Sequence, residues 1–91
     1  MVVKKIEAAK EIAERIKTDK KFESFIGNCV KSFMNGKYGF EPAASVLSNN
    51  KNLRFGVGLV TGTYRFKEHD EILIGYDHAD KTITVVYNKN E

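Results

Sequence analysis

The first part of the chain places apolar and charged residues with the period of an α-helix. Between residues 2 and 17 the apolar side chains recur every three or four positions and share one stripe: Val2, Ile6, Ala9, Ile12, Ala13 and Ile16. Charged residues fill the opposite side of this segment. The pattern therefore predicts a surface helix over residues 2–17 with one buried face.

A second helical segment carries the strongest periodic signal in the chain. Its apolar positions keep the same spacing for more than three turns: Phe22, Phe25, Ile26, Cys29, Val30, Phe33 and Met34. Thr18 and Asp19 can cap its first amides, and Asn35-Gly36 supplies a left-handed stop. Gly27 costs a helix about 1 kcal/mol relative to alanine, so we expect another backbone to approach closely there. We expect the apolar stripe to form the heart of the core.

From Leu53 onward the apolar period changes from about 3.6 to 2, and β-branched and aromatic residues predominate. Strands are expected over residues 55–66, 71–77 and 82–88, joined by connections that are short enough only for antiparallel hairpins. Between the helices and the strands, Pro42 can open a short third helix through residues 43–47.

Helices come first in the chain and strands last, which favours an α+β fold. We predict a single domain, residues 1–91, in which two N-terminal helices and the short third helix pack on one face of a three-stranded antiparallel meander. A core this small leaves little room for an internal ligand cavity, so function is expected on the surface.

The composition is that of a globular protein, with 42% hydrophobic residues and one proline. Cys29 is the single cysteine and has no partner for an intramolecular disulfide, which favours a reducing compartment. The chain begins without the apolar stretch of a signal peptide, and no run approaches the ~20 apolar residues that cross a bilayer. We therefore expect a cytoplasmic protein that does not bind membranes.

The net charge of +3 belongs to the first part of the chain, because residues 1–37 have a balance of +4 and residues 38–91 a balance of −1. Such an excess can attract nucleic acid. The candidate contacts for nucleic acid are Lys4, Lys5, Lys10, Arg15, Lys17, Lys20 and Lys21, and Lys31 belongs to the same basic footprint. These residues alternate with glutamates, so an ordinary solvated helix face is the competing interpretation.

The sequence contains little that supports a catalytic or metal-binding site. His69 and His78 both stand beside acids, but they occupy turns at opposite ends of one expected strand, about 20 Å apart, and cannot share a metal ion within one chain. Cys29 lies among apolar neighbours and is expected to be a buried structural thiol. We therefore predict no catalytic residues, no metal and no cofactor, and a protein that is not an enzyme. A minimal enzyme or metal protein, in which these histidines come together across an oligomer, is a third hypothesis beside protein binding and nucleic-acid binding.

Aromatic residues near cations suggest a different surface. Tyr38 and Phe40 lie in a turn-rich segment, and Tyr64-Arg65 ends the first expected strand. Flat rings beside a cation suit a partner's pocket, although the same rings can also cover the open side of a small core. With Lys81, these residues form the predicted protein-binding set. A non-enzymatic domain that binds another protein is therefore the first prediction, and nucleic-acid binding through the basic N-terminal half is the alternative. A homodimer through a sheet edge is a further alternative.

Four parts of the sequence resemble a small protein family carried by phages, plasmids and other mobile elements of bacteria. They are Gly36-Lys37-Tyr38-Gly39, the segment 49–53, Gly56 with Tyr64, and residues 79–84. The family shows a Gly-Asp-Trp-Gly-like motif and a closing Ala-Asp-Arg-Ser-x-Thr turn, and the likeness spans about residues 33–88. Tyr38 replaces the family's Trp and Lys81 its Arg, which puts in doubt any partner that reads these two residues. The family has no established activity, so the resemblance implies a small regulator, inhibitor or accessory binding protein.

Overall fold

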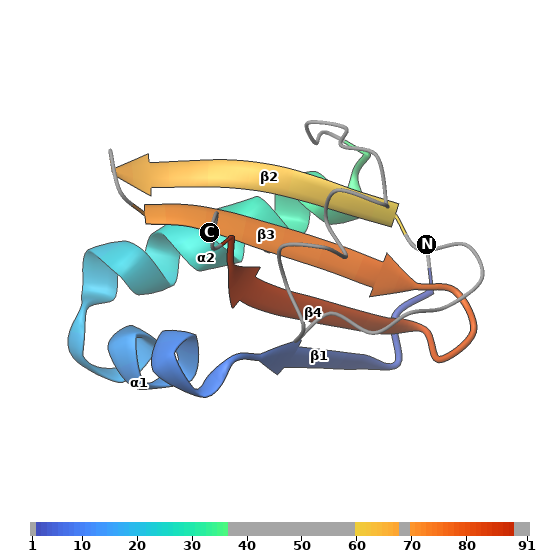
Figure 1. The fold of residues 1–91 in the computed structure, drawn as a ribbon, viewed down its shortest axis with the longest axis horizontal. Helices are drawn as coiled ribbons and strands as arrows, with labels where there is room; N and C mark the ends of the chain where they lie inside the picture. The colour runs from blue at the N-terminus through green and yellow to red at the C-terminus, as the bar shows by residue number, and fades with distance from the viewer. Residues whose placement is uncertain (1, 37–59, 68–69, 89–91) are drawn as a thin grey trace.

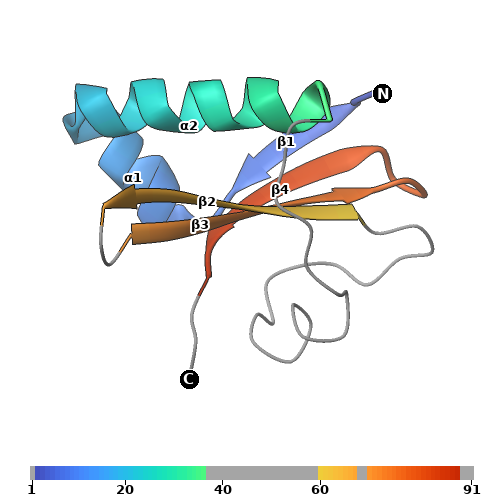
Figure 2. The ribbon, with the colours of Figure 1, turned by 90° about the horizontal axis from the view of Figure 1, so that it is seen from above.

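A computed structural model describes residues 2–36, 60–67 and 70–88. These residues form, in chain order, β1 (Lys5–Ala8), α1 (Lys10–Thr18), α2 (Lys20–Met34), β2 (Val60–Lys67), β3 (Asp70–Asp77) and β4 (Thr82–Tyr87). The strands make one mixed sheet in the order β1-β4-β3-β2 (Figure 1). Both helices lie on the same face of that sheet (Figure 2). The α+β class predicted from the sequence is confirmed.

The prediction of one helix over residues 2–17 is wrong in its first half. Lys5–Ala8 is a strand that pairs in parallel with β4, from Lys5 opposite Thr82 to Ala8 opposite Val85. Val2 and Ile6 fit a helical stripe by spacing, yet their side chains are 63% and 54% exposed. Pairing with β4, far along the chain, outweighs the local helical spacing of the apolar residues. The sheet of the described residues therefore has four strands and one parallel pair rather than three antiparallel strands.

The helix that follows β1 begins without a side-chain cap. Ala9 holds the N-cap position of α1, and its backbone N–H donates to the carbonyl of Val85 at 2.9 Å. The predicted boundaries of α2 are confirmed. Asp19 caps its start by accepting from the backbone N–H of Phe22 at 3.1 Å, and Gly36 follows its end with φ of +76°.

The stripe of α2 faces the sheet, as expected, except at its end. Phe22, Ile26, Cys29 and Phe33 are buried, Phe25 and Val30 are partly buried, and Met34 is 39% exposed. The stripe packs in one core with Ile12 of α1 and with five residues of the sheet, which are Ile72, Ile74, Tyr76, Ile83 and Val85. Leu73 and Val86 point to the other face of the sheet, where they are fully buried and pack with Ala9.

The three strands predicted from the period of two are present and antiparallel. β2 pairs with β3 and β3 with β4, with an irregularity between Arg65 and Lys67. The β3–β4 turn is held by the Asp77 carboxylate, which accepts from the backbone N–H of Ala79 at 2.8 Å. Lys81 completes this turn with a left-handed φ of 56°. Residues 55–59 of the first expected strand and the short helix expected over 43–47 lie outside the described residues.

Candidate functional site

Arg15 is held inside the fold, although the sequence offered it as a contact for nucleic acid. Its guanidinium donates to the Tyr87 hydroxyl and to the Asp70 carboxylate, both at 3.1 Å, and its carbon centre lies 4.1 Å from the centre of the Phe22 ring. The hydrogen bond to Asp70, followed by that to Tyr87, raises the pKa of Arg15 above its ordinary value. Arg15 therefore ties α1 to β3, β4 and α2, and it is the candidate least available to a phosphate.

Aromatic rings surround this arginine and join α2 to the sheet. The ring of Phe22 lies 5.5 Å from that of Phe66 in an edge-on arrangement and 6.3 Å from that of Tyr87. Phe25 lies 4.8 Å from Phe66. Such pairs stabilise a core beyond the area they bury, so this end of the molecule is built for stability.

The lysines of the helices are arranged differently from Arg15. Lys17 lies in the last turn of α1, while Lys20, Lys21 and Lys31 belong to α2, and all four are exposed. In the part of the chain that the structure describes, none of these four forms an ion pair. We call this group the outer lysine face. Lys31 completes it, and this lysine belongs to the basic footprint predicted from the sequence.

The middle of the outer lysine face is small and polar. Lys20, Ser24, Gly27 and Lys31 follow one another along α2 at spacings of three and four, on the side opposite Phe22, Ile26 and Cys29. Apart from the backbone of its own helix and its two chain neighbours, no atom of the described residues lies within 4 Å of the position that a Cβ on Gly27 would take. The expectation that another backbone approaches Gly27 is therefore wrong, and the glycine faces open space.

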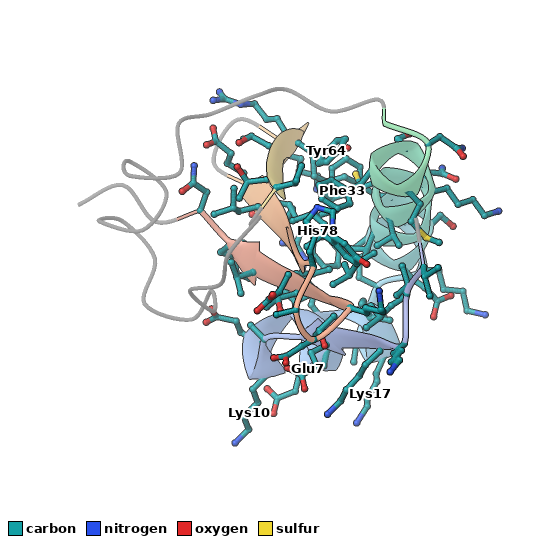
Figure 3. All side chains as sticks on the ribbon, turned by 90° about the vertical axis from the view of Figure 1, so that its right-hand side faces the viewer. Glu7, Lys10, Lys17, Phe33, Tyr64 and His78 are labelled. Atoms are coloured by element: carbon teal, nitrogen blue, oxygen red, sulfur yellow. The ribbon has the colours of Figure 1, made fainter. Side chains whose placement is uncertain are left out.

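The remaining candidate lysines lie elsewhere. Lys4 and Lys5 stand at the start of β1 beside the β3–β4 turn, since the backbone N–H of Lys4 donates to the carbonyl of Lys81 at 2.8 Å. The Lys5 ammonium lies 2.7 Å from the Glu7 carboxylate. Lys10 begins α1, and in Figure 3 both Lys10 and Lys17 extend away from the body of the molecule. The structure thus divides the predicted nucleic-acid set between two ends of the fold.

The predicted protein-binding set is also divided. Tyr64 packs against the core and lies with Phe33 between the sheet and α2 (Figure 3). Arg65 pairs with Glu71 at 2.7 Å at one end of β3, whereas Lys81 follows the other end, about 20 Å away for six residue steps. Tyr38 and Phe40 lie outside the described residues.

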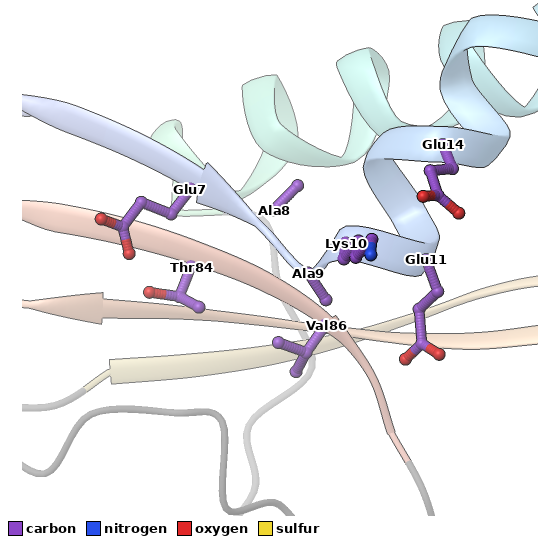
Figure 4. A pocket seen from close by; sticks show the side chains of 8 residues that line it. All are labelled: Glu7, Ala8, Ala9, Lys10, Glu11, Glu14, Thr84 and Val86. Atoms are coloured by element: carbon purple, nitrogen blue, oxygen red, sulfur yellow. The ribbon is translucent and has the colours of Figure 1, made fainter.

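A groove of about 540 Å³ opens between β1, the start of α1 and β4. Its lining consists of Glu7, Ala8, Ala9, Lys10, Glu11, Glu14, Thr84 and Val86. Figure 4 shows Glu7, Glu11 and Val86 pointing to the same side of the strands, with Ala8 turned the other way. Three glutamates against one lysine make this groove unsuited to an anion. This groove could not be predicted from the sequence pattern, because it exists only when residues 5–8 form a strand.

Neither the cysteine nor the histidines assemble a reactive site among the described residues. Burial raises the pKa of the Cys29 thiol to about 11, which keeps it protonated near neutral pH. His78 is exposed on the β3–β4 turn, with its ring 4.8 Å from that of Tyr76, and His69 lies outside the described residues. Across residues 2–36, 60–67 and 70–88, no three His, Cys, Asp or Glu side chains gather in a group that could hold a metal ion.

Comparison with protein-family models, with curated proteins and with solved structures finds no match to this chain. The resemblance to a mobile-element family therefore stays a prediction. Among the described residues, neither helix combines the length and the apolar character that crossing a membrane requires.

Proposed function

We propose that this protein is a non-enzymatic binding domain that docks on the phosphate backbone of nucleic acid through the outer lysine face. The observation that carries the proposal is the contrast among its cations. Arg15 and Arg65 are paired with carboxylates, whereas Lys17, Lys20, Lys21 and Lys31 are exposed and unpaired among the described residues. Cations without an internal partner are free to replace the counterions of a phosphate backbone.

The position of the lysines on α2 adds to this argument. Lys20 and Lys21 occupy the first turn of α2, where the helix dipole already provides partial positive charge. Cations there oppose the stability of the helix, but they strengthen its attraction for an anion. The capping carboxylate of Asp19 and the exposed Glu23 share this end of the helix, so the two lysines offset nearby acids as well as offering charge to an anionic partner.

The shape of the outer lysine face fits an extended partner. Lys20 and Lys31 lie about 16 Å apart along the helix axis, from eleven residues at 1.5 Å each. Ser24 and Asn28 between them are exposed and can donate hydrogen bonds to phosphate oxygens. Gly27 leaves the backbone of α2 open at the centre, so a polymer backbone can approach closely there.

The test is the binding of labelled duplex DNA and single-stranded RNA, measured by fluorescence anisotropy across a range of salt concentrations. We expect affinity that falls with salt, and a triple variant Lys20→Gln/Lys21→Gln/Lys31→Gln that loses roughly tenfold or more in affinity. For duplex DNA, the slope of log affinity against log salt should decrease by about 2–3, or about 0.9 for each contact removed.

A matched control removes the same charge elsewhere. The triple variant Lys4→Gln/Lys10→Gln/Lys67→Gln changes three lysines outside the outer lysine face and should keep most of the affinity. Equal losses in the two triple variants would mean attraction by net charge alone and would refute the assigned surface. No binding to either nucleic acid at low salt would refute the function.

A protein partner held at the β2 edge is the second candidate. The observation that favours it is that β2 is the last strand on its side of the sheet formed by the described residues, with the Arg65 side chain 63% exposed. It ranks second because Tyr64 is already packed against the core. If Tyr64→Ala and Arg65→Ala leave capture of a protein partner from lysate unchanged while the fold persists, this surface is wrong.

We also propose a cytoplasmic location and a mobile-element setting. The single cysteine supports the location, because its thiol is buried and needs no oxidising compartment. Detection of the protein in a secreted fraction would contradict the location. The setting rests on the resemblance of residues 33–88 alone.

A further inference from the structure

We infer that two copies of this chain associate through β1, in an antiparallel pair centred on Ile6 that joins the two sheets into one. β1 is the last strand on its side of the sheet formed by the described residues. Ile6 in the middle of this strand is an isoleucine with 54% of its surface exposed. An accessible edge strand with an exposed apolar residue at its centre can offer backbone groups that no other described strand pairs with.

Backbone geometry limits how two β1 strands can meet. The N–H and C=O groups of successive residues in a strand point alternately to its two sides, and one side of β1 is already used by β4. Residues directly opposite each other in an antiparallel pair have backbone groups that either both point to the partner strand or both point away from it. Two residues adjacent in sequence therefore cannot face each other, and the two-fold axis has to pass beside a residue rather than between two residues. The central residue is then Lys5, Ile6 or Glu7.

Charge selects among these three registers. Centring on Lys5 places two lysines opposite each other, and centring on Glu7 places two glutamates opposite each other. Centring on Ile6 places Lys5 of each copy opposite Glu7 of the other, with the two Ile6 side chains in contact. Opposite charges directly across a strand pair stabilise it and like charges destabilise it, so the pair centred on Ile6 is the favoured one.

The ion pair that Lys5 makes within its own chain competes only weakly with ion pairs between the two copies. The Lys5 ammonium lies 2.7 Å from the Glu7 carboxylate of the same strand, and the two side chains are 65% and 35% exposed. Both side chains share one face of the strand, so each can reach the opposing strand from its present position. An exposed pair of this kind contributes little by itself, and exchanging it for two cross-strand pairs adds contacts.

The symmetry has a consequence for the helices. A two-fold axis perpendicular to a continuous sheet keeps the same face of both copies on one side. The two helical layers would therefore lie side by side on one face of an eight-stranded sheet. A pair centred on Ile6 matches only residues 4–8 of the two copies, so the interface is small and the dimer is expected to be weak and dependent on concentration. The inference does not depend on nucleic-acid binding.

The test is sedimentation velocity of the whole chain from micromolar to millimolar concentration, with circular dichroism to verify the fold. Wild type should dimerise as concentration rises. Lys5→Glu and Glu7→Lys should each raise the dissociation constant roughly tenfold or more, because each places two like-charge pairs across the strands. Lys4→Glu is the matched control, since Lys4 faces Ala8 of the other copy and should leave dimerisation unchanged.

Mixing the two variants separates the contact between copies from the ion pair within one chain. Both variants lack the Lys5–Glu7 pair within their own strand, but together they place opposite charges across the two strands. We expect the mixture to form a heterodimer that neither variant forms alone. A wild type that stays monomeric throughout, or a mixture that behaves as the sum of its parts, would overturn the inference.

Discussion

The two faces of α2 differ in burial and in chemical character. The inner face consists of Phe22, Ile26, Cys29 and Phe33, all buried against the sheet. The outer face carries Lys20, Ser24, Gly27 and Lys31, all exposed. Changes on the inner face should alter the free energy of unfolding, whereas changes on the outer face should alter binding and leave the fold in place.

Truncating the inner face should have the largest effect. Phe33 has no exposed surface, so Phe33→Ala should lower the free energy of unfolding by about 3–5 kcal/mol through lost burial and the cavity that remains. Met34→Ala at the next position, where 39% of the side chain is exposed, should cost about 1 kcal/mol or less. Urea unfolding followed by circular dichroism compares the two, and similar losses would contradict the division between the faces.

Raising the pH should disturb the inner face through Cys29. Its pKa is about 11 in the folded chain and 9.0 ordinarily, so the unfolded chain loses the thiol proton first as pH rises. Stability should be unaffected by this group below about pH 9 and should fall between about pH 9 and 11, by about 1–2 kcal/mol. Urea midpoints at pH 8 and pH 10.5 measure the change.

The variant Cys29→Ala isolates the contribution of the thiol from lysines and tyrosines that titrate in the same range. It should be less stable than wild type at pH 8, but its stability should fall less steeply as pH rises. Parallel pH profiles for wild type and Cys29→Ala would show that the thiol is not the group responsible.

Filling the centre of the outer face should have the smallest effect, with the opposite sign. Gly27 has a helical backbone and open space around it, so Gly27→Ala should raise the free energy of unfolding by about 0.5–1 kcal/mol. Gly36→Ala is the contrasting control, because its φ of +76° disfavours a side chain and should make that variant less stable. Thermal unfolding resolves both shifts, and a destabilised Gly27→Ala would mean that something does pack there.

Most of the fold can be predicted from local sequence, and the wrong predictions about the strands share one cause. The stripe of α2, the Asp19 cap and the antiparallel hairpins depend on neighbouring residues and are confirmed. β1 was missed because Val2 and Ile6 fit a helical spacing, while the pairing with β4 is a contact between distant parts of the chain. The groove beside β1 was missed for the same reason.

The candidate site follows from the sequence only in part. The basic character of the first helices is visible in composition, and the exposed lysines agree with it. Arg15 could not be separated from these lysines by spacing, because its partners Asp70 and Tyr87 lie in distant strands. Gly27 was misjudged because a glycine inside a helix looks the same in sequence whether its surroundings are crowded or empty.

The pairing of β1 with β4 also sets the order in which the protein can be completed during synthesis. Lys5–Ala8 is translated before Thr82–Val85, the residues it pairs with, which are added roughly 4–15 seconds later at ordinary rates of translation. The nascent chain can form α1 and α2 during that interval, while Lys5–Ala8 has no strand beside it among the described residues. Within the described sheet, β1 is therefore made before the other strands but can pair only after β4 has been made.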